Sequence, residues 1–471
     1  MAVPLLSLVL VLTGVAASFG GEVAVDTGAV SCFGAAGDSA GTVWVAVGRP
    51  DAKLQVFRSD DQGMTWTSPA WFQLDSFARQ VEVVVGRGDS GRVFVFYLSA
   101  ANDGDLWVVA LDPVSMEWRR SAVCVGPDTI DDFSVAVDLD TNYYLYCLYA
   151  NERRAGLTGH FTRSRDFGRT WDATQDWWNC WDPCVAHMSG STVHVAWRDA
   201  ETGRRIYYSW NRHYGAPAHW GPLHPVGSGT GRSFDPVVAV SDTAPEWLAT
   251  VWVFYSVGRR DSSMTDIEFS YSTDGGWSWQ TGLPLDSTFA DEWLPDAQAG
   301  RNGSAVDLCY YYGGKGPNEP TAVMWRCGSS WDPGYFSAAV KVSNMRCEPA
   351  TAGCRPRVVQ FPGTVPHSPG FLFSRAGPSG VWFAAPLGGP GPVVGTGVVA
   401  VPNPCRAGMA VMIRGLDDSR MQRVEVFDAA GRQLRVVRGG LWDGRDELGR
   451  AVPAGAYLLR CGAARGRVVL Y

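Results

Sequence analysis

Short runs of alternating apolar and polar residues recur along most of the chain. Residues 192–197 read TVHVAW, residues 205–210 read RIYYSW, and similar runs occupy 249–256 and 266–272. β-Branched and aromatic residues between glycine-rich turns are typical of β-strands. Few segments show a sustained helical period, so the pattern predicts an all-β fold.

An eight-residue motif returns three times among these runs. Residues 59–66 read SDDQGMTW, residues 164–171 read SRDFGRTW and residues 272–279 read STDGGWSW. All three fit Ser-x-Asp-x-Gly-x-(Thr/Ser)-Trp, with 105 and then 108 residues between their starts. Half of that spacing is the length of one β-unit, so the chain is predicted to place a motif-free unit between each pair.

Related strand openings support a count of seven units. They begin near residues 31, 79, 132, 182, 235, 296 and 355. Four-stranded units of this length, repeated radially, are the blades of a β-propeller. The last unit has only three runs, and residues 22–25 (EVAV) are predicted to add its outer strand and close the ring. The alternative is six blades, with residues 31–66 misread as a unit.

The position of the motif after a third strand predicts a structural turn. Its Asp is expected to accept hydrogen bonds from turn amides, its Gly to permit a positive φ, and its Trp to pack between blades. These predicted structural residues are Ser59, Asp61, Gly63, Trp66, Ser164, Asp166, Gly168, Trp171, Ser272, Asp274, Gly276 and Trp279.

The three motifs resemble the Asp-box (BNR) repeat of sialidase-like β-propellers, over residues 22–386. That family contains sialidases, other glycosidases and propellers without known activity. Its sialidases use three arginines, a Tyr/Glu nucleophile pair and an Asp acid/base. Their N-terminal Phe/Tyr-Arg-Ile-Pro motif is absent here, so no catalytic residue is carried over.

The two ends of the chain predict export. Residues 1–17 hold an apolar run followed by Val15-Ala16-Ala17, as in a cleaved signal peptide. After a Gly/Pro-rich linker at 387–399, residues 400–471 resemble type IX secretion sorting domains and the Ig-like domain of flagellar hook-capping proteins. The carriers are Pro-Asn-Pro at 402–404, WDGRD at 442–446 and PAGAY at 453–457. The resemblance implies a small β-sandwich, the type IX secretion machinery as partner, and a secreted or outer cell-surface protein.

Charge and cysteine content narrow the classes of partner. The net charge of −7 divides into +5 for residues 397–471 and −12 for the rest, and an acidic body disfavours nucleic acid. No stretch after the N-terminus is apolar enough for a transmembrane helix. Eleven cysteines in an exported chain suggest disulfides, with 124–147, 180–184, 309–327, 347–354 and 405–461 as plausible pairs and Cys32 left over. No metal-ligand spacing is present, and no cofactor is expected.

The candidate ligand site is the channel mouth where the first strands begin. Carboxylates crowded there raise one another's pKa or bind a cation, whereas the structural alternative is that each Asp caps a turn. Arginines and tryptophans beside them suit a polar ring such as a sugar. The candidate residues are Asp132, Asp182, Asp235, Asp296, Arg79, Arg355, Trp177, Trp178, Trp181 and Trp293.

Two functions remain open from sequence. The favoured one is an exported propeller that binds a glycan or a cell-surface protein at the channel mouth. The alternative is a divergent sialidase-like exo-glycoside hydrolase, which three arginines converging beside a Tyr/Glu pair would support.

Overall fold

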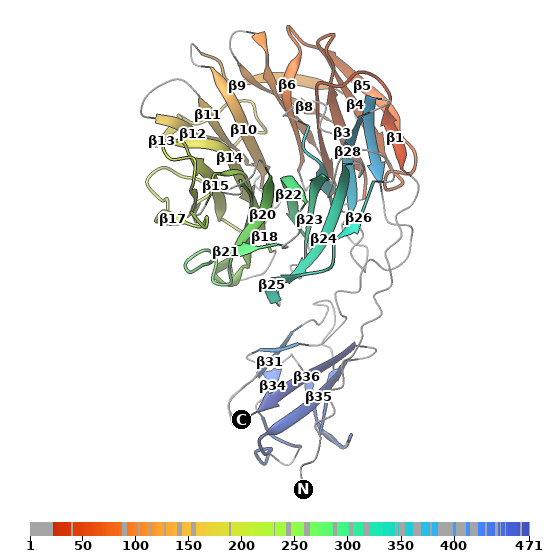
Figure 1. Ribbon diagram of the computed structural model, residues 1–471, viewed down its shortest axis with the longest axis vertical. Coiled ribbons are helices and arrows are strands. Elements are labelled where there is room, and N and C mark those ends of the chain that lie inside the picture. The colour runs from red at the N-terminus through yellow and green to blue at the C-terminus, as the bar shows by residue number, and fades with distance from the viewer. Residues whose placement is uncertain are drawn as a thin grey trace. The chain divides into compact units, whose positions relative to one another are not determined.

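The computed structural model describes residues 22–384 and 399–470, each with gaps, and divides the chain into two units, Met1–Gly391 and Pro392–Tyr471. The predicted signal peptide and almost all of the predicted linker lie outside the described residues. No helix in the described ranges has the length and hydropathy needed to cross a bilayer. The first unit is a ring of antiparallel sheets (Figure 1).

The first four blades each contain four consecutive strands. Their strands are β2 (Cys32–Gly37), β3 (Val43–Gly48), β4 (Lys53–Ser59) and β5 (Thr67–Gln73); β6 (Ala78–Val85), β7 (Val93–Ser99), β8 (Leu106–Leu111) and β9 (Trp118–Cys124); β10 (Ile130–Val137), β11 (Leu145–Asn151), β12 (Leu157–Ser164) and β13 (Gln175–Trp178); and β14 (Cys180–His187), β15 (Val193–Asp199), β16 (Ile206–Asn211) and β17 (His224–Pro225).

Three further blades complete the ring. Blade five holds β18 (Ser233–Val240), β19 (Val251–Gly258), β20 (Thr265–Ser272) and β21 (Gln280–Pro284), with the single-turn 3-10 helix η2 (Glu246–Leu248) between β18 and β19. Blade six holds β22 (Asp291–Ala299), β23 (Ala305–Gly313), β24 (Ala322–Ser329), β25 (Asp332–Phe336) and β26 (Val340–Lys341). Blade seven holds β27 (Arg357–Val359), β28 (Gly370–Ala376), β29 (Ser379–Ala384) and β1 (Val23–Asp26).

The N-terminal strand closes the ring, as predicted. β1 pairs antiparallel with β29, with Val23 opposite Phe383 and Ala24 opposite Trp382. The sheet formed by β2 to β5 is a complete blade, so the six-bladed alternative is wrong for this chain. Each core of buried aromatic and β-branched side chains is shared by neighbouring blades, for example around Trp252 and Phe254 in blades four to six.

The Ser-x-Asp motifs form hydrogen-bonded turns after the third strands of blades one, three and five. In blade three, Asp166 accepts hydrogen bonds from the Thr170 amide at 2.9 Å and the Thr170 hydroxyl at 2.7 Å, and Gly168 N–H donates to Ser164 Oγ at 2.8 Å. Blades one and five repeat these contacts around Asp61 and Asp274. The motif Gly residues have φ values of 73° to 95°, which a side chain would strain. The motif Trp packs on the preceding blade, as the 4.6 Å between the Trp279 and Tyr208 rings shows.

The second unit contains two antiparallel sheets. One orders β30 (Val399–Val401), β31 (Val411–Arg414) and β34 (Leu441–Trp442); the other orders β33 (Gln433–Arg438), β32 (Arg423–Phe427), β35 (Gly455–Cys461) and β36 (Ala464–Leu470). Trp442 is fully buried and packs edge-on against Tyr457, 5.4 Å away. The Ig-like and sorting character of this unit stays a prediction.

The expected disulfides do not appear among the described cysteines. Cys180 and Cys184 share strand β14 but belong to different cores, so this pairing is wrong. The other pairings stay predictions, and Cys405 lies outside the described residues.

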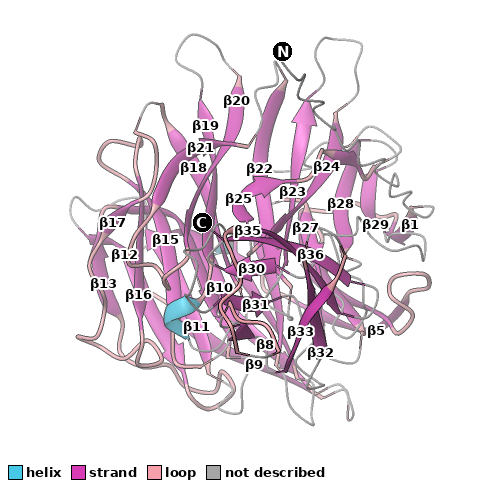
Figure 2. Ribbon diagram, turned by 90° about the horizontal axis from the view of Figure 1, so that it is seen from below, coloured by secondary structure: helices cyan, strands magenta, loops and turns pink. Residues whose placement is uncertain are grey.

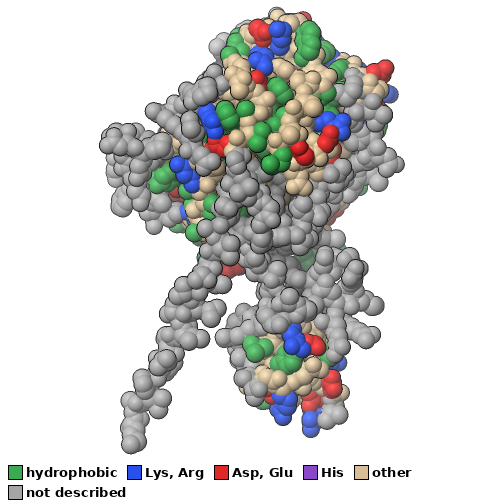
Figure 3. All heavy atoms as spheres, turned by 90° about the vertical axis from the view of Figure 1, so that its right-hand side faces the viewer, with side chains coloured by type: hydrophobic (Ala, Val, Ile, Leu, Met, Phe, Trp, Pro, Cys, Tyr) green, Lys and Arg blue, Asp and Glu red, His purple; other side chains and the backbone are tan. Residues whose placement is uncertain are grey.

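On the face in Figure 3, acidic and basic side chains are interspersed with hydrophobic ones.

Candidate functional site

The first strands of all seven blades line a central cavity of about 230 Å³. Side chains two residues apart on one strand point to the same side, so each strand presents successive residues to the channel. We call the face where the first strands begin the upper face. The Ser-x-Asp turns end third strands, which run antiparallel to the second, and therefore lie on the opposite, lower face.

β-Bulges bend five of these first strands near the upper face. The pairing register shifts between residues 78 and 80, 130 and 132, 181 and 184, 234 and 237, and 293 and 296. At three of them a non-glycine residue before a proline has a positive φ: 46° at Asp182, 53° at Asp235 and 52° at Leu294. Such strain is held only where the surrounding structure fixes it, and bulges re-aim side chains beside functional sites.

These bulges correct one sequence equivalence. Asp296 was expected to match Asp182 and Asp235, but the residue before proline in blade six is Leu294. Asp296 instead occupies the position of Cys184 in blade four, because both accept a backbone N–H from the next blade: Val358 N–H on Asp296 at 2.8 Å and Val238 N–H on Cys184 at 3.3 Å. The equivalent positions are marked by the following proline, which is Pro295 in blade six, and not by an acidic side chain.

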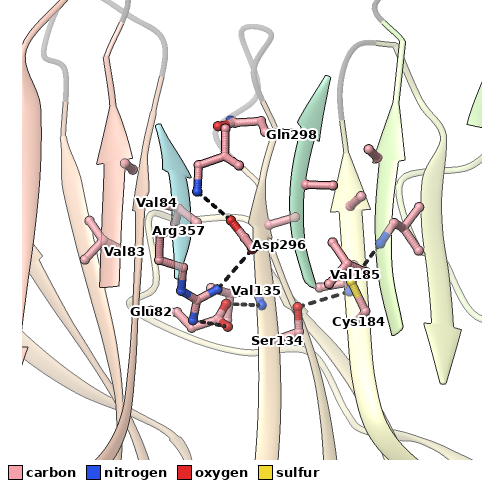
Figure 4. A pocket seen from close by; sticks show the side chains of 18 of the residues that line it. Glu82, Val83, Val84, Ser134, Val135, Cys184, Val185, Asp296, Gln298 and Arg357 are labelled. Atoms are coloured by element: carbon pink, nitrogen blue, oxygen red, sulfur yellow. Dashed lines mark hydrogen bonds and ion pairs between the residues drawn. The ribbon is translucent and has the colours of Figure 1, made fainter. Parts of the chain in front are cut away.

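Four such bonds join neighbouring blades along the channel wall. Glu82 accepts the Val135 N–H at 3.3 Å, and Ser134 accepts the Val185 N–H at 3.1 Å. Figure 4 shows these contacts beside the equivalent bond of Cys184. In blades two, three, four and six, a channel-facing side chain thus ties the first strand of the next blade.

The upper layer of the channel brings together charges from four blades. Arg355 lies 2.8 Å from Asp235 and 4.0 Å from Asp132, so a side chain of blade seven reaches carboxylates of blades five and three across the channel. Arg198 Nε lies 2.8 Å from Oδ2 of Asp182, which also accepts the Asp235 N–H at 3.2 Å, and Arg198 Nη2 donates to Oδ1 at 3.1 Å. Between 18% and 24% of each of these five side chains remains exposed.

A second charged layer lies below the first. Arg357 stands 3.3 Å from Glu82 and 3.5 Å from Asp296, as Figure 4 shows. Beneath it, the channel-facing residues are mostly small and apolar: Ala36, Val84, Ala136, Ala186 and Ala239, with Gln298. Because these side chains are small, they leave the axis of the ring open as a cavity. Its wall is charged near the upper face and mostly apolar below.

Burial perturbs the acids of this channel. It raises the pKa of Asp132 to about 7, against the opposing effect of Arg355 and with a further increase from Asp182. Burial also raises the pKa of Glu82 and of Asp235. Burial alone lowers the pKa of a guanidinium, but the surrounding carboxylates raise that of Arg355 overall. The site therefore holds an acid that titrates near neutrality beside fixed cations.

The aromatic and basic residues predicted beside the channel acids fall into two groups: some lie at the channel mouth, and others pack inside or between the blades. Trp181 lies under the Arg198 guanidinium at 4.8 Å, beside Asp182. Trp177 instead packs against Phe161 and Trp220, and Trp293 stacks on Tyr311 at 5.9 Å, so both serve blade packing. Arg79 donates to the Ile130 carbonyl at 2.6 Å and joins two blades. The side chain of Trp178 lies outside the described residues.

Sequence reasoning missed three charged members of the channel: Glu82, Arg198 and Arg357. Arg357 follows the predicted opening residue Arg355 by two positions, so a period of two would have pointed it into the channel. Glu82 follows Arg79 by three positions, because a bulge lies between residues 78 and 80. Arg198 comes from a second strand and carries no signal of that kind. No tyrosine lines the cavity among the described residues, and its arginines are already paired with carboxylates.

Metal binding is not supported by this charge arrangement. No group of three or more His, Cys, Asp or Glu side chains in the described ranges is placed to hold an ion. Arginines occupy the space between the carboxylates instead.

Comparison with known proteins shows the fold. No protein-family model matches the chain, and no curated protein matches it significantly. Among solved structures, the BP39L lectin from Burkholderia pseudomallei has a TM-score of 0.56 at 13% identity, covering 77% of this chain and 98% of the lectin. A PL25 polysaccharide lyase, an ulvan lyase, has a TM-score of 0.52 at 11% identity, covering 78% of this chain and 95% of the lyase. The structural neighbours of this chain thus include a lectin and a polysaccharide lyase.

Proposed function

We propose that the chain is an exported carbohydrate-binding propeller whose ligand docks at the upper channel mouth. One observation carries this proposal: Asp132, Asp182, Asp235, Arg198 and Arg355 converge there, held in place by one another yet partly open to solvent. Carboxylates accept hydrogen bonds from sugar hydroxyls and guanidinium groups donate to them, so a prearranged set of both suits a saccharide. Trp181 adds an aromatic surface at the same place.

The test is a glycan array followed by titration of each bound glycan against variants. Asp182→Asn keeps the shape of the side chain and tolerates the positive φ of this residue, so the fold is retained. We expect it to weaken binding at least tenfold. Asp60→Asn, an exposed carboxylate in a lower-face turn, is the matched control and leaves binding unchanged. Binding that is insensitive to Asp182→Asn, or seen only with protein ligands, overturns the proposal.

A glycan-active enzyme is the second candidate, and one observation favours it. Asp132, with a pKa near 7, is suited to donate a proton, and Asp182 lies close enough to raise that pKa. Sialidase chemistry in particular is not favoured, because the three channel arginines are paired with carboxylates. Reducing-end release from an array-positive glycan, lost in Asp132→Asn while binding persists, would establish catalysis.

The export part of the proposal rests on the N-terminal apolar segment and on the resemblance of residues 400–471 to sorting domains. We expect deletion of 400–471 to leave the propeller folded, because the second unit has its own sheets, and to stop its passage through the outer membrane. Fractionation of cells and medium measures this. Normal appearance of the truncated protein outside the cell overturns the sorting role.

A further inference from the structure

A second cluster of aromatic residues lies on the lower face, where blades four and five meet. Trp277 and Trp247 are 52% and 59% exposed, and Leu248 beside them is 42% exposed. Trp247 and Leu248 belong to η2, which Figure 2 shows in cyan, and Trp277 belongs to the Ser-x-Asp turn of blade five. Large exposed apolar groups gathered from separate loops mark an interaction site.

The two loops that carry these tryptophans are fixed against each other. Gly275 N–H donates to the Ala249 carbonyl at 3.1 Å, and a Cβ on Gly275 would lie 3.0 Å from the Trp247 Cα. Trp277 N–H donates to Asp274 at 3.0 Å within its turn. In the other two turns this position is Met64 or Arg169, so the rigid turn presents a different side chain in each blade.

Arg212 from blade four lies against the exposed Trp277 ring. Its guanidinium carbon is 5.4 Å from the Trp277 ring centre and 5.8 Å from that of the buried Trp210, and these two rings meet edge-on at 4.8 Å. Nε and Nη2 of Arg212 are buried and have no hydrogen-bond partner among the described residues. A buried cationic donor left unpaired is costly, so the Arg212 side chain gains free energy if it turns towards an acceptor that a ligand brings.

The nearby carboxylates are already engaged. Asp274 accepts hydrogen bonds from the amides of its own turn and from the Ser278 hydroxyl at 2.6 Å. Glu246 accepts the Ser191 N–H at 2.6 Å and also contacts the Thr192 hydroxyl. No ion pair joins either carboxylate to Arg212 among the described residues, so the Arg212 guanidinium can pair with an anionic ligand.

We propose that this cluster, defined by Arg212, Trp247 and Trp277, binds a saccharide that carries a carboxylate or sulfate group. Pyranose rings present apolar C–H faces that pack on indole rings, while Arg212 pairs with the acidic substituent. The site lies on the face opposite to the upper channel mouth and shares no residue with it. It therefore stands independently of the function proposed for the channel.

The test uses the full chain and two matched pairs of probes: dextran sulfate with dextran, and polygalacturonate with its methyl ester. We expect the acidic member of at least one pair to bind at least tenfold more tightly than its neutral partner. Trp277→Ala and Arg212→Met should each reduce that affinity at least tenfold. Met64→Ala, at the same position of the blade-one turn and 59% exposed, should leave it unchanged.

Two comparisons keep this test decisive. Asp182→Asn should not alter binding of the acidic probe, which separates this cluster from the channel mouth. Trp277 is 52% exposed and packs on Trp210, so its truncation should lower the melting temperature only slightly, and binding is measured well below that temperature. Equal binding of acidic and neutral probes, no binding at all, or equal losses in Trp277→Ala and Met64→Ala each overturn the proposal.

Discussion

Aspartates on the two faces of the propeller have the same side chain and opposite environments. On the lower face, Asp166 accepts hydrogen bonds from its own turn, and these lower its pKa although partial burial acts in the other direction. On the upper face, burial raises the pKa of Asp132, and its cation comes from another blade. Local bonds stabilise the carboxylate on one face, and long-range charges balance it on the other.

This difference shows where each kind of residue draws its stability. The turn carboxylates are satisfied within eight residues, so each turn is a separate structural unit. The channel carboxylates depend on Arg355, which is 120 residues from Asp235 in sequence. Loss of one channel cation should therefore disturb several carboxylates together, whereas loss of a turn aspartate should remain local.

The largest effect is expected from Arg355→Met. It removes the cation shared by Asp235 and Asp132 and leaves both half-buried acids without it. Breaking a buried ion pair from one side costs about 3 kcal/mol. Urea denaturation at pH 8 measures the loss of unfolding free energy. Arg58→Met, which removes an exposed pair with Asp60, should cost under about 1 kcal/mol. Similar losses in the two variants would contradict a shared role for Arg355.

Next in size is Asp166→Ala. It removes an acceptor used by the Thr170 amide and hydroxyl and by Ser164, and should lower the unfolding free energy by about 1–3 kcal/mol. The affinity of any channel ligand should remain unchanged, because the turn lies on the lower face. Thermal melting and a glycan titration of the same sample check both parts. A variant as stable as the wild type would show that water replaces these bonds.

Sequence was sufficient for most of the fold because the relevant signals are local. The Ser-x-Asp turns, the strand alternation and the short last unit are visible within a few residues, and together they predicted seven blades and closure by residues 22–25. Blade four shows where this local signal fails, because its turn lacks the Ser-x-Asp motif. Its third strand ends at Asn211, whose side chain accepts the His213 and Gly215 amides in place of the Ser and Asp of the motif.

The candidate site was less predictable because its geometry depends on bulges and on contacts between blades. Asp132, Asp182 and Asp235 were found from their position at strand openings, and Arg355 from a related opening. The misplacement of Asp296 came from a bulge whose residue count a single sequence does not reveal. Trp177 and Trp293 adjoin these acids in sequence, but strand alternation turns their rings into blade cores.

A smaller effect is expected from Asp132→Asn, and it depends on pH. The folded pKa is near 7 and the unfolded value near 4, so between these pH values only the folded state holds the proton. Titration of Asp132 should therefore lower the unfolding free energy as the pH rises from 4 to 7, which is measured as the difference between the wild type and the variant. Asparagine does not titrate, so the variant lacks this contribution. The two pH profiles should therefore diverge by roughly 1–2 kcal/mol between pH 4 and 7, a value reduced because water reaches part of the Asp132 side chain. Parallel pH profiles of wild type and variant would contradict the shifted pKa.

The smallest effect on stability is expected from Asp182→Asn, and it separates the two kinds of aspartate most directly. Asparagine keeps an oxygen for the Asp235 N–H and tolerates a φ of 46°, while losing the charge opposite Arg198. The amide oxygen can keep both contacts of Oδ2, and only the bond from Arg198 Nη2 to Oδ1 is lost, so the unfolding free energy should change by about 1 kcal/mol. Asp296→Asn should cost more than Asp182→Asn, because Asp296 pairs with Arg357 in the deeper layer and also holds the Val358 N–H. Urea denaturation of the three variants gives the order. If Asp182→Asn proves as destabilising as Asp166→Ala, then Asp182 is a structural cap like the turn aspartates, and the upper mouth loses its main argument as a ligand site.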